Sequence, residues 1–244
     1  MRIDSLALQM RPRTPHEAAD LGVRLCQANA GAVYRCYFMV AIPVALLSLS
    51  LFEANAWLPG LLMWWAKPWL DRTVVFVLAR AAFGQVTTPR DLWQAQREVW
   101  WRQLLSTWTW RRLSPWRSFT QPVCQLEGLG FLQVRRRIVL LRKRRTGAAA
   151  MITAAFSWAE TSLVLGLVSL LFWFSPPGSG FDLQSLLDGY ESPLLDLFMS
   201  VSYLLAVLFL EPFYVAAGFG MYLNRRTELE AWDIEQEFRR AFAT

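Results

Sequence analysis

Long apolar stretches of the chain alternate with stretches rich in charge. A helix needs about 20 mostly apolar residues to cross the hydrocarbon core of a bilayer, which is about 30 Å thick. Four stretches approach this requirement, and we expect spanning helices at about residues 32–52, 57–84, 147–174 and 194–223. The third is the clearest, because residues 161–181 contain no Asp, Glu, Lys or Arg.

The stretch at 57–84 is the least regular of the four. Ten apolar residues, Trp57 to Ala66, are followed by the polar sequence KPWLDR at residues 67–72. The apolar pattern then resumes from Thr73 to Gly84, where Arg80 is the only charged residue. This pattern fits either one kinked span or a re-entrant hairpin.

Charge indicates the orientation. Residues 85–146 hold 13 Lys or Arg and three acidic residues, whereas Ser175 to Asp196 hold four acidic residues and no basic one. Because basic loops stay on the cytoplasmic side, we place residues 85–146 and the C-terminal helix end, 224–244, inside the cell and the acidic loop outside. The N-terminal arm is also rich in Arg, so four spans with both termini inside satisfy every segment.

The expected fold is all-α: a single integral membrane domain over residues 1–244. It is a polytopic helical membrane protein with about four transmembrane helices plus interfacial amphipathic helices. One interfacial helix should begin at Pro15, because Thr14 can cap it and Glu17 can complete a capping box. The segment 85–146, rich in Arg and Trp, should lie along lipid headgroups.

Composition narrows the function classes. The chain is 55% hydrophobic, carries a net charge of +6 and contains 13 Trp but a single histidine, His16. Zinc sites and His-based catalytic triads are therefore disfavoured, and Cys26, Cys36 and Cys124 form no CxxC pair. Since no phosphate-loop, HExxH or GxSxG motif is present either, we expect no enzymatic activity, no metal and no cofactor.

The positive charge comes almost wholly from 23 Arg, which fits either an anionic lipid surface or a nucleic acid. Because the Arg-rich segment is tethered between two spans, we favour membrane phospholipids and expect no nucleic-acid partner. The candidate headgroup contacts immediately precede the third span and are Arg135, Arg136, Arg137, Arg142, Lys143, Arg144 and Arg145.

Two carboxylates, Glu160 and Glu211, lie inside predicted spans, where each costs at least ~2.5 kcal/mol unless it is paired, protonated or hydrated. Glu160 is 13 residues from Gly147 and Glu211 is 13 residues from Asn224, the cytoplasmic limits, so the two can share one depth. If 57–84 is one kinked span, Asp71 and Arg72 reach a matching depth, and Arg72 becomes the candidate counter-ion. This predicted polar cluster fits a structural salt bridge, or a site for proton coupling, headgroup binding or gating.

Small residues recur along two of the spans. The third span carries a strip of Ala155, Ala159, Ser162, Gly166 and Ser169. The fourth carries a similar strip of Ser202, Ala206, Phe209, Phe213, Ala216 and Gly220. Because small residues let helix backbones approach closely in lipid, we expect these two spans to pack together through their strips.

The sequence EPFYVAAGFGMYLNRRTELEAWDIEQEFRR, Glu211 to Arg240, resembles the closing helix of a family of uncharacterised proteobacterial integral membrane proteins. The stretches RTPHEAADLG (Arg13 to Gly22), WWAKPWLDRTVVFVLARAAFG (Trp64 to Gly84) and TWRRLSPWRSFTQPVCQLEGL (Thr109 to Leu129) resemble other motifs of that family. More distantly, Tyr222 to Glu235 is similar to the membrane domain associated with glycerophosphodiester phosphodiesterases, whose catalytic barrel has no counterpart here. The resemblance implies a bacterial inner-membrane location and MoxR-type ATPase or von Willebrand A-type membrane partners, and it implies no known activity.

We therefore expect a non-catalytic inner-membrane scaffold or partner-docking component with anionic-lipid contacts. The main alternative is a small transporter or lipid-handling membrane protein that uses the predicted polar cluster of Glu160, Glu211, Asp71 and Arg72. A third alternative, a membrane hydrolase, needs a nucleophile or metal cluster that the sequence does not offer. A scaffold should tolerate neutral substitutions at both glutamates, whereas a transporter should not.

Overall fold

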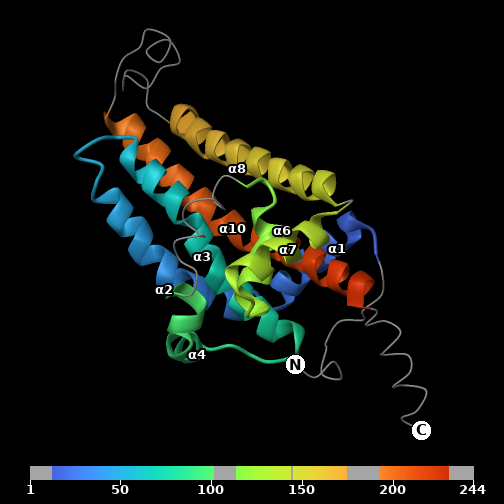
Figure 1. The fold of residues 1–244 in the computed structure, drawn as a ribbon. Coiled ribbons are helices and arrows are strands. Elements are labelled where there is room, and N and C mark those ends of the chain that lie inside the picture. The colour runs from blue at the N-terminus through green and yellow to red at the C-terminus, as the bar shows by residue number, and fades with distance from the viewer. Residues whose placement is uncertain (1–12, 102–113, 144, 175–192, 231–244) are drawn as a thin grey trace.

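The computed structural model describes residues 13–101, 114–143, 145–174 and 193–230, and every regular element in these ranges is a helix (Figure 1). In chain order the elements are α1 (Pro15–Ala28), α2 (Ala30–Leu49), α3 (Leu58–Ala82), α4 (Pro89–Gln94), the short π-helix η2 (Arg97–Trp101), α6 (Arg117–Leu126), α7 (Phe131–Arg142), α8 (Thr146–Phe174) and α10 (Pro193–Glu230). The predicted all-α class is therefore confirmed for the part of the chain that the structure describes.

Three helices, α2, α8 and α10, are long and apolar enough to cross a membrane. They correspond to the predicted spans at 32–52, 147–174 and 194–223. The stretch 57–84 forms α3, one continuous helix of 25 residues through KPWLDR, so the re-entrant hairpin is wrong. Because of its charged residues, α3 is not apolar enough to count as such a helix. The described ranges therefore contain three helices that are long and apolar enough to cross a membrane, whereas about four were predicted.

The central helix is α10, which contacts α1, α2, α3, α6, α7 and α8. Its 38 residues extend over about 57 Å at 1.5 Å per residue, nearly twice the thickness of a hydrocarbon core. From Pro193 to Leu210 it leaves many large apolar side chains exposed, whereas almost every residue from Glu211 to Asn224 is buried. The helix thus passes from an exposed apolar part into an enclosed part (Figure 1).

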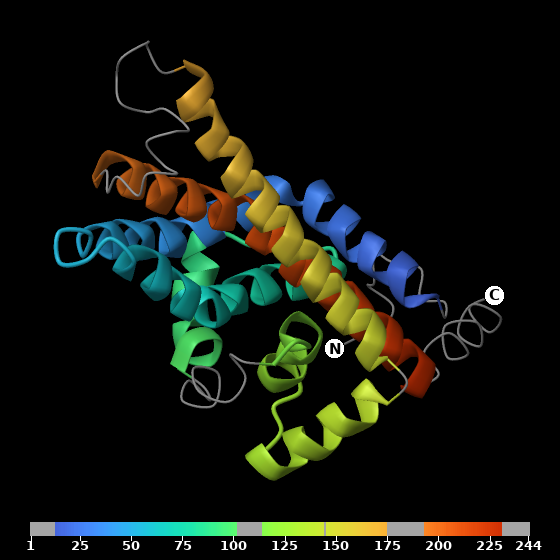
Figure 2. The same ribbon diagram turned by 90° about the horizontal axis from the view of Figure 1, so that it is seen from above.

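The N-terminal helix α1 lies along the enclosed part of α10 (Figure 2). The predicted capping box is present: Glu17 N–H donates to Thr14 Oγ1 at 3.4 Å, and Thr14 N–H donates to the Glu17 carboxylate at 3.1 Å. Glycines allow the close approach, since a Cβ on Gly22 would lie 2.0 Å from the carbonyl oxygen of Ala216. One face of the expected interfacial helix is therefore buried against α10 rather than in lipid.

The helices α8 and α10 pack together, but not through the predicted strips. All five small residues of the α8 strip are exposed, and a Cβ on Gly166 would meet nothing within 4 Å. The contact uses another face of α8, where the Phe156 ring lies 5.7 Å from the Tyr214 ring and the hydroxyl groups of Thr153 and Tyr214 are 3.2 Å apart. The reason is Glu160, which binds a buried cation: the strip lies about 140° around the helix from it, so turning the carboxylate inward turns the strip outward.

Candidate functional site

Helix α3 places two opposite charges on one buried face. Lys67 and Asp71 are four residues apart, which puts both on the same side of a helix. Their side chains are only 7% and 1% exposed. Charges buried to this extent need partners, because an uncompensated ion in the interior is strongly destabilising.

Lys67 binds two carboxylates from two other helices. Its Nζ lies 2.5 Å from Oε2 of Glu160 on α8 and 3.1 Å from Oε2 of Glu211 on α10. The same ammonium is 5.5 Å from the centre of the Tyr203 ring, which attracts a cation through its π face. Lys67 therefore joins α3 to α8 and α10.

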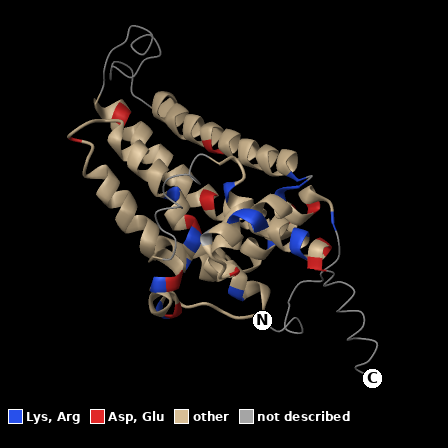
Figure 3. Cartoon of the chain, in the orientation of Figure 1, with Lys and Arg blue, Asp and Glu red and all other residues tan. Residues whose placement is uncertain are grey.

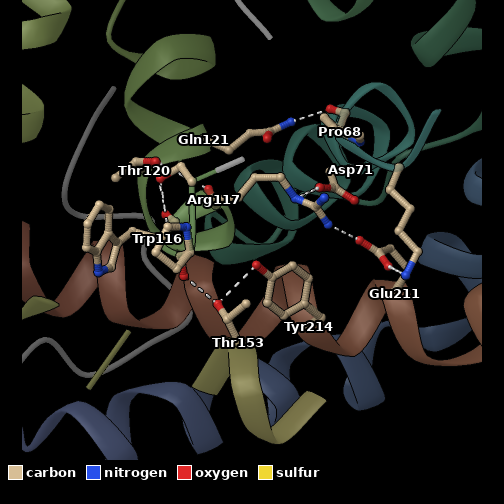
Figure 4. A network of polar contacts seen from close by, with 12 residues as sticks. Pro68, Asp71, Trp116, Arg117, Thr120, Gln121, Thr153, Glu211 and Tyr214 are labelled. Carbon is tan, nitrogen blue, oxygen red and sulfur yellow. Dashed lines mark hydrogen bonds and ion pairs between the residues drawn. The ribbon is translucent and has the colours of Figure 1, made fainter. Parts of the chain in front are cut away.

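Arg117, the first residue of α6, supplies the second cation. Its Nε lies 3.0 Å from Oδ2 of Asp71, and its guanidinium also donates to Oε1 of Glu211 (Figure 4). The centre of the guanidinium is 5.2 Å from the centre of the Tyr214 ring. Glu211 thus receives both cations, one on each carboxylate oxygen.

We name Lys67, Asp71, Arg117, Glu160 and Glu211 the ion-pair network. It connects α3, α6, α8 and α10, because each cation contacts carboxylates from two helices. With every group ionised, two positive and three negative charges leave a formal charge of −1. Among the described residues, neither oxygen of Asp71 accepts a well-directed hydrogen bond. In this ionised state the network has one more carboxylate than it has cations, and the oxygens of Asp71 lack a well-directed hydrogen-bond donor in the described part of the chain.

Two glutamines fix the register of α6 on α3. Gln121 donates through Nε2 to the carbonyl oxygen of Pro68 at 2.7 Å, and Gln125 donates in the same way to that of Arg72 at 2.8 Å. The donors are four residues apart on α6 and the acceptors four residues apart on α3. Arg117 precedes Gln121 by four residues and so lies on this same face of α6.

The start of α6 is also tied to α8. The hydroxyl of Thr153 donates to the carbonyl oxygen of Pro115 at 2.7 Å, and the indole N–H of Trp116 donates to that of Thr146 at 3.0 Å (Figure 4). The guanidinium of Arg142 stacks on the Trp116 ring, 3.4 Å from its centre. These contacts with α7 and α8 hold Trp116, the residue before Arg117, in place.

The structure brings together three members of the predicted polar cluster: Glu160, Glu211 and Asp71. Their ion-pair partners are Lys67 and Arg117, so these two residues take the counter-ion role expected for Arg72. Arg72 is buried as well, but it lies about 100° around α3 from Asp71 and therefore faces another side of the helix.

The sequence held a signal for Lys67 but not for Arg117. Lys67 and Asp71 stand at the i,i+4 spacing that pairs side chains on one helical face, and this spacing could have identified Lys67 within KPWLDR. Arg117 lies in the segment that composition assigns to lipid headgroups. Only the folding of α6 against α3 and α10 places it in the interior.

A pocket of about 390 Å³ lies against the ion-pair network, between α3, α8, α10 and the start of α6. Four members of the network line it, all except Asp71. Trp64, Phe156 and Tyr214 supply aromatic walls, and Ser157 and Thr161 supply hydroxyl groups. The pocket thus combines a charged floor with apolar and hydrogen-bonding walls, as ligand sites commonly do.

Some of the predicted headgroup contacts are exposed, and others contact residues within the protein. Arg135, Arg136 and Lys143 are exposed, and Arg144 lies outside the described residues. Exposed apolar side chains accompany them on α7, with Leu132 70% and Val139 62% exposed. The two apolar residues and the three basic ones fall within an arc of about 100° around the helix, so α7 presents one face of mixed apolar and basic character.

The other three basic residues are engaged within the protein. Arg137 Nε lies 3.0 Å from Glu127, and its guanidinium also binds a carboxylate near the end of α10. Arg145 lies 2.6 Å from Glu228 on α10. Arg142 stacks on an indole as described above. Arg137 and Arg145 therefore hold α7 and the start of α8 to the C-terminal part of α10, and Arg142 holds the end of α7 to the start of α6.

Within the described ranges, no group of three or more His, Cys, Asp or Glu is arranged to hold a metal ion. Cys26, Cys36 and Cys124 are buried and form no disulfide among the described residues. Comparison of the chain with protein-family models, with curated proteins and with solved structures finds no match. The family resemblance of residues 211–240 therefore stays a prediction.

Proposed function

We propose that this protein is a non-catalytic scaffold of the bacterial inner membrane, in which α2, α3, α8 and α10 cross the bilayer. The observation that carries this proposal is the change along α10 at Glu211. Before this residue, side chains such as Leu205 and Phe209 are more than half exposed, and after it the helix is enclosed by α1, α6 and α7. A membrane around the first part and a helical layer around the second part account for both halves.

The composition of α8 supports the same proposal. Only Ala149, Ile152 and Val168 are buried among its 29 residues. Large apolar side chains cover its outer surface, including Trp158 at 73% and Trp173 at 83% exposure. Soluble proteins rarely leave so continuous an apolar surface in water, whereas lipid solvates it without cost.

The distribution of charge supports the orientation. Charged residues gather around α6, α7 and the enclosed part of α10, whereas most of α2 and α8 carries none (Figure 3). We propose that this charged layer is cytoplasmic and that the exposed face of α7 contacts anionic headgroups. The same layer is then the surface available to a MoxR-type ATPase or von Willebrand A-type partner.

Cysteine labelling in intact cells tests the membrane placement, because the native cysteines are buried. Gly178→Cys should react with a membrane-impermeant maleimide added outside. Lys143→Cys, at an exposed position on the other side, should react only after the membrane is permeabilised. Labelling of Lys143→Cys in intact cells contradicts the orientation. Co-purification in mild detergent, probed for the two partner types, then tests the docking role.

A second candidate function is lipid or solute handling, and the pocket beside the ion-pair network favours it. In a pure scaffold, Glu160→Gln should leave partner binding unchanged once folding is verified. In a handling protein, this substitution should abolish function even when the fold survives, because it alters the lining of the pocket. A growth or transport assay of the folded variant separates the two.

A further inference from the structure

The depth of the pocket follows from contacts between helices. Tyr34 on α2 donates through its hydroxyl to the carbonyl oxygen of Phe209 at 2.7 Å, so the neighbourhood of Glu211 lies level with the start of α2. From this level, α2 continues for 15 residues to Leu49, or about 22 Å. On α8, the 14 residues from Glu160 to Phe174 span about 21 Å.

The corresponding stretch of α10, from Pro193 to Glu211, covers 18 residues or about 27 Å. On α3, Lys67 lies nine residues, or about 14 Å, from Leu58. Measured from the outer ends of the four helices, the network therefore lies about 14–27 Å inward. A hydrocarbon core is about 30 Å thick. On the proposed membrane placement, the pocket lies between the middle of the core and its cytoplasmic boundary.

The charge of the network selects the kind of ligand. If every member is ionised, the formal charge of −1 repels an isolated anion, and both cations already bind carboxylates. Glu160 is the most accessible of the three carboxylates, with 19% of its side chain exposed, against 3% for Glu211 and 1% for Asp71. A cation entering the pocket meets Glu160 first.

The oxygen atoms that can accept hydrogen bonds in this pocket favour a cation that donates them. A primary ammonium has three N–H donors, and the hydroxyl oxygens of Ser157 and Thr161 line the pocket beside Glu160. Trp64 and Phe156 also line the pocket, and aromatic rings attract a positive charge placed over their faces. If a ligand ammonium binds Glu160, Lys67 keeps its ion pair with Glu211.

We propose that this pocket binds a primary ammonium group, presented from the inner leaflet by a lipid such as phosphatidylethanolamine. The proposal rests on the membrane placement given above. A soluble amine shares the chemistry, so the source of the ammonium is decided by the test. A quaternary ammonium, which has no N–H donor, should bind less well.

Native mass spectrometry of the full-length protein in detergent tests this proposal. With equal amounts of phosphatidylethanolamine, phosphatidylcholine and phosphatidylglycerol added, we expect phosphatidylethanolamine to be retained about fivefold or more over phosphatidylcholine. Glu160→Gln should reduce this ratio to near one. Thr161→Val should also reduce it while leaving every ion pair intact, and so decides the matter if Glu160→Gln fails to fold. Ser162→Ala, an exposed position next along α8, is the matched control and should change nothing.

Free ethanolamine identifies the source of the ammonium. If it displaces the lipid at millimolar concentration, the ligand is a soluble amine; if it does not, the ligand is the lipid. Equal retention of phosphatidylethanolamine and phosphatidylcholine, or a preference that survives both Glu160→Gln and Thr161→Val, overturns the proposal. When cysteine labelling agrees with the membrane placement, such a result removes the ammonium site alone.

Discussion

Lys67 on α3 donates to Glu160 on α8, with Nζ 2.5 Å from Oε2. Glu160 is 14 residues from each end of α8, so this contact holds the helix at its midpoint. Since so little else of α8 is buried, the ion pair fixes which face of the helix turns inward. Together with the contacts of Thr153 and Phe156, this ion pair turns the small-residue strip outward.

The two glutamates should differ in their contribution to stability. Glu211 is 3% exposed and binds both cations, whereas Glu160 is 19% exposed and binds one. We expect Glu211→Gln to lower the free energy of unfolding by about 3 kcal/mol or more and Glu160→Gln by about 1 kcal/mol. Unfolding by denaturant in detergent checks the order, and a greater loss for Glu160→Gln contradicts the assigned geometry.

The sequence predicted the elements better than it predicted their contacts. Apolar length located α2, α8 and α10 to within a few residues at most ends, because a helix long and apolar enough to cross a membrane needs a nearly uninterrupted apolar pattern. Beyond the predicted end of the fourth span at 223, the helix continues to Glu230, within the predicted C-terminal helix end at 224–244. The ion pairs Arg225–Glu228 and Arg226–Glu230, at i,i+3 and i,i+4, are a local signal for this continuation. The further pairing of Glu228 with Arg145 and of Glu230 with Arg137 depends on the fold.

The candidate site was predicted in part for the same reason. Glu160, Glu211 and Asp71 were identifiable because isolated charges in apolar stretches need compensation. Arg117 was not, because it lies more than 30 residues from any of them in an Arg-rich segment, and its burial depends on tertiary packing. Isolated charges in apolar stretches therefore identified the carboxylates, whereas the cations that bind them were identified from the fold.

The contact between α1 and α10 should depend on glycine. Gly22→Ala and Gly220→Ala should each lower the free energy of unfolding by about 1–3 kcal/mol, because their Cβ atoms would lie 2.0 Å and 2.2 Å from backbone carbonyl oxygens. Gly166→Ala, where nothing lies within 4 Å, should be neutral or slightly stabilising, since alanine favours a helix by about 1 kcal/mol. Equal effects at all three positions contradict the packing of α1.

The cysteines should report on folding. Burial raises the pKa of the Cys26 thiol from 9.0 to about 12, because the thiolate loses its hydration. Maleimide should therefore not label the folded chain at pH 8, and should label all three cysteines after unfolding in detergent. The folded state also holds this proton more tightly, so the stability that Cys26 contributes is complete below pH 9 and falls as the pH rises towards 12. Rapid labelling of the folded chain contradicts the burial of α1.

The exposed face of α7 should select anionic lipid. Replacing Arg135 and Arg136 together by Glu should lower the amount of phosphatidylglycerol that co-purifies with the protein, and high salt should lower the retention by the natural chain. The matched control is Arg24→Glu, an exposed basic position on α1. A control that loses as much lipid as the double variant indicates a non-specific charge effect and contradicts a role for α7.

The central claim, that buried ion pairs hold α3, α6, α8 and α10 together, is tested most directly by the free energy of unfolding of three variants in detergent. Lys67→Met leaves three carboxylates with one cation and should cost about 3–5 kcal/mol. Adding Glu160→Gln restores the natural formal charge of −1, so the double variant should recover more than half of that loss, although the second change alone is destabilising. Arg24→Ala, which removes a pair that is largely exposed on both sides, should cost almost nothing. Losses that simply add in the double variant would contradict the account.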